Sequence, residues 1–317
     1  MIRSLLDRLR RVRGTGASAS TNPAEQVTHA LPGNEGKVLR LHGFWPGADS
    51  DHTLIALLGQ MVSKRVQAYQ AVCVASVFAP PPSDRRDDTL YVQFSGESRF
   101  HDPALFDVNL IPAKAGPKIV PMPYMAFEYL WNAKIARRCA VRAGSPTALR
   151  RRKFCLFVVS NAASRERLDF FKRLSARMPV DSFGAVLNNQ GGRRPVGQRG
   201  DNSYLDLIGQ YRYMICFENC RADGYLTEKL MNAYAGGAVP IYWGCPQVSN
   251  WVNPNAVLEI DCEYTAASAN NLVQRVLDLE SRPEEYRRIH AQPLFAGGTV
   301  PDAFDLQRVI TQIAACR

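Results

Sequence analysis

Amide, acidic and basic side chains are concentrated in the stretch FENCRADGYLTEK (217–229). Glu218 and Asn219 end an apolar stretch that is typical of a strand, and Glu228 and Lys229 begin one that is typical of a helix. A helix N-terminus carries free N–H groups and about half a positive charge, which attract phosphate. A lysine in that first turn is unfavourable unless an anion lies nearby, so Lys229 predicts a phosphate site. A solvent-facing lysine is the alternative.

Two arginines offer a second cation for the same ligand. Arg165 and Arg167 follow the strand-like stretch 153–159 and lie in the first turns of the next expected helix. This is the equivalent place in the preceding β/α pair, and ligands of open α/β sheets bind outside the carboxyl ends of the strands. A solvated arginine is the alternative for either residue.

A carboxylate follows an expected strand in the first half of the chain. Glu97 comes directly after Gly96 at the end of TLYVQFSG. A carboxylate at a strand end is a candidate general base, with an ordinary surface glutamate as the alternative. Asp49 and Asp51 form a D-x-D pair of the kind that can hold a divalent metal, but such pairs are frequent by chance. The five histidines show no metal-ligand spacing.

Two series of alternating strand-like and helix-like stretches position these residues. The first occupies 37–150 and includes one long expected helix, Tyr124–Cys139, and the second occupies 151–292. The polar, basic stretch Ala140–Lys153 is broken by Gly and Pro, so we place the domain boundary there, a surface loop within one domain being the alternative. Such alternation favours parallel sheets. We therefore predict an α/β protein of two Rossmann-like lobes with an interdomain cleft.

The two ends of the chain stand outside this alternation. Residues 1–36 combine a basic amphipathic segment with a flexible linker, and the segment either lies on an anionic membrane or is a frayed terminus. Residues 293–317 predict a C-terminal helix that packs back on the first domain or forms a dimer contact.

Composition narrows the class of protein. With 317 residues, 46% of them apolar, the chain is globular, and it has no apolar run as long as a membrane span. The net charge of +10 fits a phosphate-bearing ligand, nucleic acid, an anionic membrane or an ordinary basic surface. Eight cysteines, mostly in apolar runs, are too few for a disulfide scaffold and favour a reducing, cytoplasmic compartment.

The stretch 217–244, FENCRADGYLTEKLMNAYAGGAVPIYWG, resembles the signature of the α-1,3/α-1,4-fucosyltransferases of glycosyltransferase family 10. That signature is F-E-N-S, a gap, Y-[VI]-T-E-K, a helix, and A-[VI]-P-[VI] with a glycine. Cys220 replaces the serine and Leu226 replaces Val or Ile. FVVSN with RLDFFKRLSARMPVDSFG, and the segment FSGES, are similar to further family segments, so the resemblance covers about Lys37 to Asp261.

The resemblance implies a GT-B fold with the acceptor lobe first, 37–150, and the GDP-fucose lobe second, 151–292. It implies inverting transfer of L-fucose from GDP-β-L-fucose to a hydroxyl of an N-acetylglucosamine-containing glycan, such as a lipopolysaccharide or another cell-surface glycan. We expect an α-1,3 linkage, with α-1,4 left open. A glycosyltransferase using a different nucleotide sugar is the alternative, and a non-catalytic basic binding protein is a more distant one.

The resemblance also implies roles for single residues. Glu97 matches the catalytic base, and Arg167 and Lys229 match the cations that face the diphosphate, with Arg165 as the alternative to Arg167. The remaining donor-site positions are Asn219, Tyr225, Thr227 and Glu228, of which Thr227 is also the expected helix N-cap. We expect no metal site and no required cofactor, leaving stimulation by Mn²⁺ or Mg²⁺ open. We expect a cytoplasmic enzyme, with peripheral contact to the inner membrane face through the N-terminal basic helix.

Overall fold

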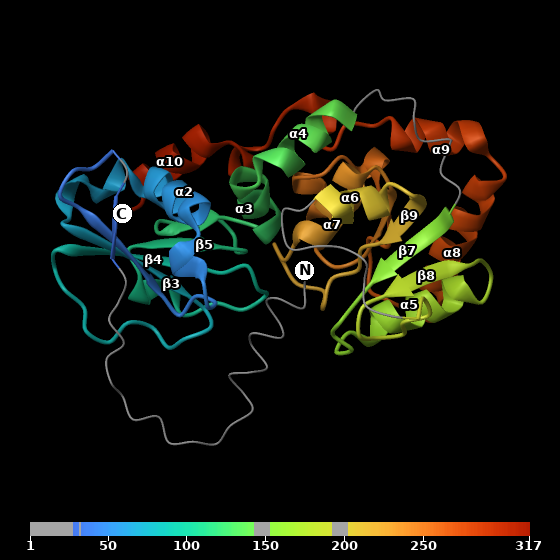
Figure 1. Cartoon of the computed structure of the whole chain (residues 1–317), viewed down its shortest axis with the longest axis horizontal. Coiled ribbons are helices and arrows are strands. Elements are labelled where there is room, and N and C mark those ends of the chain that lie inside the picture. The colour runs from blue at the N-terminus through green and yellow to red at the C-terminus, as the bar shows by residue number, and fades with distance from the viewer. Residues whose placement is uncertain (1–27, 32, 143–152, 192–201) are drawn as a thin grey trace, which may run out of the picture. The chain divides into compact units, whose positions relative to one another are not determined.

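The computed structural model describes residues 28–31, 33–142, 153–191 and 202–317, and these divide into two compact units (Figure 1). The N-terminal unit comprises the described residues of Arg3–Trp131 together with Asp302–Arg317, and the C-terminal unit those of Asn132–Pro301. The expected basic amphipathic segment and the linker up to residue 26 lie outside the described residues. No described helix is long and apolar enough to cross a membrane.

A six-stranded sheet forms the centre of the N-terminal unit, and its strands lie side by side in chain order. They are β1 (Thr28–Ala30), β2 (Val38–His42), β3 (Ala71–Ser76), β4 (Thr89–Phe94), β5 (Val108–Ile111) and β6 (Ile119–Pro121). Only β1 runs antiparallel to its neighbour, and the other pairs are parallel. We expected residues 28–30 to belong to a linker, and that prediction is wrong because they pair with β2 as an edge strand.

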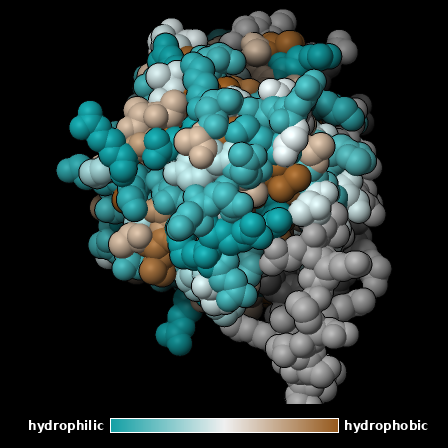
Figure 2. All heavy atoms as spheres, turned by 90° about the vertical axis from the view of Figure 1, so that its left-hand side faces the viewer, coloured by the Kyte–Doolittle hydropathy of each residue, from teal (hydrophilic) through white to brown (hydrophobic). Residues whose placement is uncertain are grey.

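Helices α2 (His52–Val62), α3 (Tyr124–Trp131) and α10 (Leu306–Ala315) pack in the same unit. The sequence left two alternatives for the C-terminal helix, packing on the first domain or dimerisation. In the structure α10 contacts α2 and β6 and buries Val309, Ile310 and Ile313. Figure 2 shows a mostly hydrophilic face on the side where the strands of this unit lie in Figure 1, with hydrophobic residues only scattered over its described part.

The long helix expected over Tyr124–Cys139 is in fact two helices, α3 and α4 (Ala133–Arg142). Asn132 interrupts it, and its side-chain oxygen accepts a hydrogen bond of 3.3 Å from the Ile135 N–H, as an N-cap does. Helix α4 then packs on α7 (Glu228–Gly236). The division between the units therefore precedes the boundary that the composition of Ala140–Lys153 suggested.

The C-terminal unit is built on a fully parallel sheet of five strands. They are β7 (Lys153–Val158), β8 (Val180–Phe183), β9 (Tyr211–Ile215), β10 (Val239–Tyr242) and β11 (Leu258–Glu259). Its further helices are α5 (Arg165–Ser175), α6 (Asn202–Ile208), α8 (Ala266–Glu280) and α9 (Pro283–His290). Short 3₁₀ turns connect elements in both units, at Ala48–Ser50, Arg65–Ala68, Pro103–Leu105, Val248–Asn250, Pro254–Ala256, Ala296–Gly298 and Asp302–Phe304.

The strand order of this sheet, β11-β10-β9-β7-β8, fixes where a ligand should bind. From β7 the chain adds β8 on one side, and it then adds β9, β10 and β11 on the other. The order thus reverses between β7 and β9, and such a switch point opens a crevice at the carboxyl ends of the strands. In the N-terminal unit β2 to β6 follow one another without a reversal.

Apolar side chains on both faces of the C-terminal sheet form its core. Strand β7 is buried over five consecutive residues, Phe154 to Val158, as expected for a parallel strand covered by helices on both faces. Phe157, Phe170 and Phe217 belong to the same core cluster, so the positions that follow the strand ends rest on packed aromatic rings. All eight cysteines are free thiols, and six are buried, which agrees with their apolar sequence settings.

Candidate functional site

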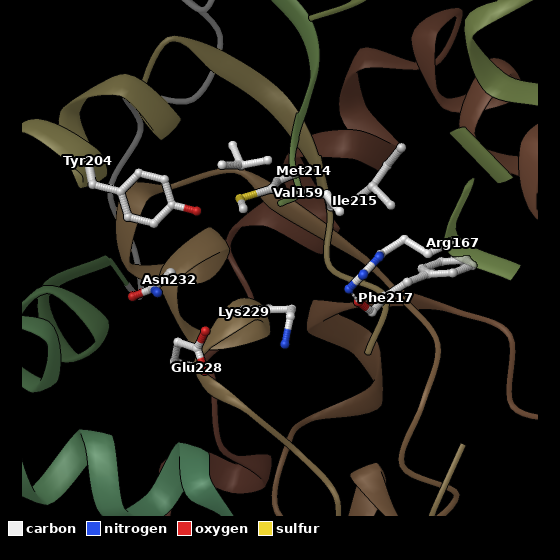
Figure 3. A pocket seen from close by; sticks show the side chains of 10 residues that line it. Val159, Arg167, Tyr204, Met214, Ile215, Phe217, Glu228, Lys229 and Asn232 are labelled. Carbon is white, nitrogen blue, oxygen red and sulfur yellow. Dashed lines mark hydrogen bonds between the residues drawn. The ribbon is translucent and has the colours of Figure 1, made fainter. Parts of the chain in front are cut away.

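A pocket lies at the switch point of the C-terminal sheet, where β7 and β9 end (Figure 3). Its lining residues are Val158, Val159, Arg167, Tyr204, Met214, Ile215, Phe217, Glu228, Lys229 and Asn232. The strands supply an apolar wall, and helices α5 and α7 supply the charged groups. Figure 3 shows Arg167 and Lys229 reaching the pocket from different elements.

Helix α7 begins where the sequence predicted, at Glu228, and Gly237 ends it with a left-handed φ of 87°. Thr227 occupies the N-cap position, but its hydroxyl makes no capping bond and donates to Glu218 instead. The position predicted for Thr227 is confirmed, whereas its predicted capping role is wrong. The Thr227 side chain therefore accepts no hydrogen bond from the first-turn N–H groups of α7. Such groups are the ones that bind anions at a helix N-terminus.

Lys229 already has an anionic partner within the protein. Its Nζ donates to Oε2 of Glu218 and to the Thr227 hydroxyl, both at 2.8 Å. Burial lowers the pKa of Lys229, but the carboxylates of Glu218 and Glu228 outweigh it and hold the pKa above its ordinary value. Because Glu218 offsets its charge, the position of Lys229 in the first turn of α7 does not by itself require an external anion.

Arg167 has no anionic hydrogen-bond partner among the residues that the structure describes. Ser164 N-caps α5 and brings Arg167 into the first turn, where it is only 2% exposed. Its guanidinium donates to Asn219 Oδ1 at 2.9 Å and to the Asn161 carbonyl at 2.6 Å, and both acceptors are neutral. No carboxylate among the described residues forms an ion pair with it, and its Nε has no hydrogen-bond partner there. Burial lowers the pKa of Arg167, an effect that Glu218 and Tyr225 partly offset.

Asn219 connects this arginine to the loop between β9 and α7. Its side-chain oxygen accepts from Arg167, and its Nδ2 donates to the Tyr225 hydroxyl at 3.2 Å. The structure therefore brings the predicted donor-site residues together at the carboxyl edge of the C-terminal sheet, namely Arg167, Asn219, Tyr225, Thr227, Glu228 and Lys229. Arg165, the alternative to Arg167, is exposed on α5 and does not line the pocket.

Glu97 lies in the N-terminal unit, at the carboxyl end of β4, as predicted from the sequence. The buried Ser95 hydroxyl accepts from the Glu97 N–H at 3.2 Å and donates to the Arg99 carbonyl at 2.6 Å, which shapes the turn. The ring of Tyr124 packs so close to Gly96 that a Cβ there would lie 2.5 Å from it. The Glu97 side chain is half-buried on this fixed turn.

The D-x-D pair has a structural explanation. Asp51 N-caps α2 and accepts from the Leu54 N–H at 2.9 Å, and Asp49 lies 3.7 Å from His29 Nε2. In the described ranges no group of three or more His, Cys, Asp or Glu side chains is placed to hold a metal ion.

The sequence assigned no role in the site to three of its polar residues, Glu218, Asn232 and Tyr204. Glu218 stands directly before Asn219, and its complete burial was the missing information. Asn232 lies one helical turn after Glu228, a spacing that puts both side chains on the same face of a helix. Tyr204 comes from α6, and no signal in the sequence joined that helix to the site.

Comparison with known proteins shows that the region around this site is similar to a known family. Residues 148–292 match the model of "Glycosyltransferase family 10 (fucosyltransferase) C-term", and they include Arg167 and the whole stretch 217–244. This part of the chain is therefore similar to the C-terminal domain of glycosyltransferase family 10. The matched region contains every pocket residue named above, and it coincides with most of the C-terminal unit.

Two relatives of the matched region have names that state different activities. An α-(1,3)-fucosyltransferase of Helicobacter pylori is 35% identical over 133 residues, which cover 42% of this chain and 26% of that protein. A GDP-fucose protein O-fucosyltransferase 3 of Gallus gallus is 26% identical over 219 residues, covering 65% of this chain and 44% of that protein. The chain thus spans less than half the length of these relatives.

The fold extends the similarity beyond residues 148–292. A crystal structure of an α1,3-fucosyltransferase with GDP-fucose superposes with a TM-score of 0.66 at 19% identity, over 98% of this chain and 96% of that one. The predicted GT-B class, an α/β fold of two Rossmann-like lobes, is confirmed at this level. At this identity the likeness concerns the fold alone.

Proposed function

We propose that the chain is an inverting α-1,3-fucosyltransferase that moves L-fucose from GDP-β-L-fucose to a hydroxyl of an N-acetylglucosamine-containing glycan. The proposal depends on the environment of Arg167 at the switch point of the sheet. Arg167 is 2% exposed and has no carboxylate partner among the described residues. A buried cation without a counter-charge is costly, and an anionic ligand would compensate it. The name of one relative, GDP-fucose protein O-fucosyltransferase 3, supplies GDP-fucose as that ligand.

The diphosphate of the donor would lie where cations and helix N–H groups converge. Arg167 and Lys229 line the same pocket, and the first turn of α7 is not capped by Thr227. As the bond between fucose and phosphate breaks, negative charge grows on the departing GDP. Fixed donors aimed at such developing charge are each worth on the order of 2–4 kcal/mol.

Glu97 would act as the general base of the reaction. Its carboxylate removes the proton of the acceptor hydroxyl while that oxygen attacks the anomeric carbon of fucose. The bond between the anomeric carbon and the phosphate oxygen of GDP breaks, and GDP leaves with the electron pair. The configuration at the anomeric carbon inverts. The transition state has oxocarbenium character, as in other glycosyl transfers. Glu97 is supported here by its fixed position after β4 and by its match to the family segment.

Incubation with GDP-fucose and a panel of N-acetylglucosamine acceptors tests the function. We expect GDP release with N-acetyllactosamine and an α-1,3 linkage in the product, and an α-1,4 product from type 1 chains would revise the linkage. Folded protein that releases no GDP with any acceptor would contradict the proposal. Thermal shifts with GDP-fucose, GDP-mannose and UDP-sugars test the alternative of another nucleotide sugar.

Transfer of fucose to a protein hydroxyl is the second candidate function. It is favoured by the alignment with a GDP-fucose protein O-fucosyltransferase 3, which covers more of this chain than the alignment with the α-(1,3)-fucosyltransferase does. The two functions share the donor site and differ in the acceptor. Adding folded protein domains and Ser- or Thr-containing peptides to the acceptor panel separates them.

We propose further that the reaction requires no metal and takes place at the cytoplasmic face of a membrane. Arg167 and Lys229 supply the positive charge that a metal would otherwise provide. Full activity in EDTA is the expected result, and stimulation by Mn²⁺ or Mg²⁺ is measured in the same assay. Sedimentation of the full chain with anionic vesicles tests membrane contact through the basic N-terminal segment.

A further inference from the structure

Glu218 is a completely buried carboxylate in the candidate site, and none of the roles proposed above uses it. Its Oε1 accepts from the Thr227 backbone N–H at 2.7 Å, and its Oε2 accepts from Lys229 Nζ at 2.8 Å. The Thr227 hydroxyl lies 2.9 and 2.8 Å from the two carboxylate oxygens. The Glu218 N–H donates to the Trp243 carbonyl at 2.9 Å, which ties the residue to the edge of the sheet.

These bonds restrict how the Lys229 ammonium can point. An ammonium has three N–H donors. Lys229 uses one on Glu218 and one on the Thr227 hydroxyl, and no acceptor for the third occurs among the described residues. Because the donors are tetrahedral, fixing two of them fixes the direction of the third. The side chain is 13% exposed and lines the pocket beside Arg167 (Figure 3).

Gly244 reserves the space that the Glu218 side chain fills. A Cβ at position 244 would lie 2.5 Å from Cγ and 2.6 Å from Cβ of Glu218, closer than such atoms approach one another. Gly244, at the end of AVPIYWG, therefore allows the buried Glu218 side chain to pack against the residues that follow β10.

We propose that Glu218 is a positioning residue that, together with the Thr227 hydroxyl, holds the Lys229 ammonium so that its third N–H donates to the diphosphate of the bound nucleotide. The inference rests on the proposed function for the identity of that ligand. Glu218 also engages the Thr227 hydroxyl, and this leaves the first-turn N–H groups of α7 to the same anion. In this proposal the third N–H of Lys229 points in a fixed direction, and Lys229 does not act as a mobile counter-charge.

Titration calorimetry with GDP tests this in two backgrounds. Glu218→Gln, which keeps the shape but removes the charge, should weaken GDP binding about 10- to 100-fold in the wild type. In a Lys229→Met background the same substitution should change GDP affinity less than about twofold, because there is no ammonium left to position. Equal losses in both backgrounds would indicate a merely structural role and overturn the proposal, as would unchanged affinity of Glu218→Gln. Thr227→Val, which removes one of the two acceptors, gives the same comparison if Glu218→Gln does not fold.

A measurement without nucleotide separates this proposal from the function on which it rests. In protein labelled with ¹⁵N-lysine, the Lys229 Nζ signal is assigned by its loss in Lys229→Met. Its protons should exchange with water at least about 10-fold more slowly than those of exposed lysines, and Glu218→Gln should abolish the difference. Fast exchange in the wild type overturns the positioning role even if GDP binds. Folded wild type that does not bind GDP would instead contradict the proposed function.

Discussion

Arg167 donates a hydrogen bond of 2.9 Å from Nη1 to the Asn219 side-chain oxygen across 52 residues of sequence. The two residues follow β7 and β9, the strands between which the sheet order reverses. The bond therefore crosses the switch point and fixes one edge of the guanidinium to a neutral acceptor. The Nε of Arg167 is buried and has no hydrogen-bond partner among the described residues.

Asn219→Ala tests whether this bond organises the site. The variant removes the acceptor of Arg167 and the donor to Tyr225, so we expect GDP binding to weaken about 10-fold, the value of one hydrogen bond to a charged group. Asn271→Ala, at an exposed position on α8, is the control and should leave the affinity unchanged. Calorimetric titration with GDP measures both. Wild-type affinity in Asn219→Ala would show that Arg167 holds its position without this amide.

Glu97→Gln tests the assignment of the base. The variant keeps the shape of the side chain but cannot take a proton, so transfer should fall at least about 100-fold. GDP affinity should stay at the wild-type level, because Glu97 belongs to the other unit of the chain. The exposed Glu35→Gln in the same unit is the control for both measurements. Near-normal turnover of Glu97→Gln would remove Glu97 as the base.

Arg142 predicts a stability effect at the far end of α7. It is 5% exposed, donates to the carbonyls of Tyr234 and Ala238 at 2.6 and 3.0 Å, and places its guanidinium 3.9 Å from the Tyr234 ring centroid. Arg142→Met should lower the free energy of unfolding by roughly 2–3 kcal/mol, measured by urea denaturation, because buried carbonyls lose a charged donor. The exposed Arg137→Met on the same helix should change it by less than about 0.5 kcal/mol. Equal stabilities of the two variants would argue against this contact.

The Lys229–Glu218 pair predicts that the stability of the folded protein depends on pH in the alkaline range. The pKa of Lys229 in the folded protein lies above the ordinary 10.5, since the carboxylates of Glu218 and Glu228 outweigh the effect of burial. A raised pKa contributes stability that is fully present below the unfolded value and is lost as the pH rises through the folded value. Above pH 10.5 the wild type should therefore lose stability more steeply than the variant that combines Glu218→Gln with Lys229→Met. Parallel pH profiles would mean that the ammonium is not stabilised by this pair.

Local patterns in the sequence were enough for the strands and helices that carry the site. The apolar stretch before Asn161, the start of α7 at Glu228 and its end at Gly237 all follow from local rules, namely periodicity and glycine stops. The break at Asn132 was missed because an N-cap in the middle of an amphipathic stretch looks like any polar helix position. Strand β1 was missed because three residues are too short to show a period.

The distribution of charge within the site could not be predicted in the same way. The sequence shows that Lys229 opposes its helix dipole, but it does not show that Glu218, eleven residues earlier, turns inward and offsets that charge. It likewise offers Arg165 and Arg167 as equals, and only the rotation of α5 buries one and exposes the other. Pairings of this kind depend on tertiary distances, which a single sequence does not contain.

The most direct test of the central claim is the GDP affinity of the wild type, Arg167→Ala and Arg165→Ala, each shown to be folded by circular dichroism and measured by titration calorimetry. We predict saturable binding to the wild type, a loss of at least about 30-fold in Arg167→Ala, since one such contact with a phosphate is worth 2–4 kcal/mol, and no change in Arg165→Ala. Folded wild type without GDP binding, or equal affinities of the wild type and Arg167→Ala, would contradict the account.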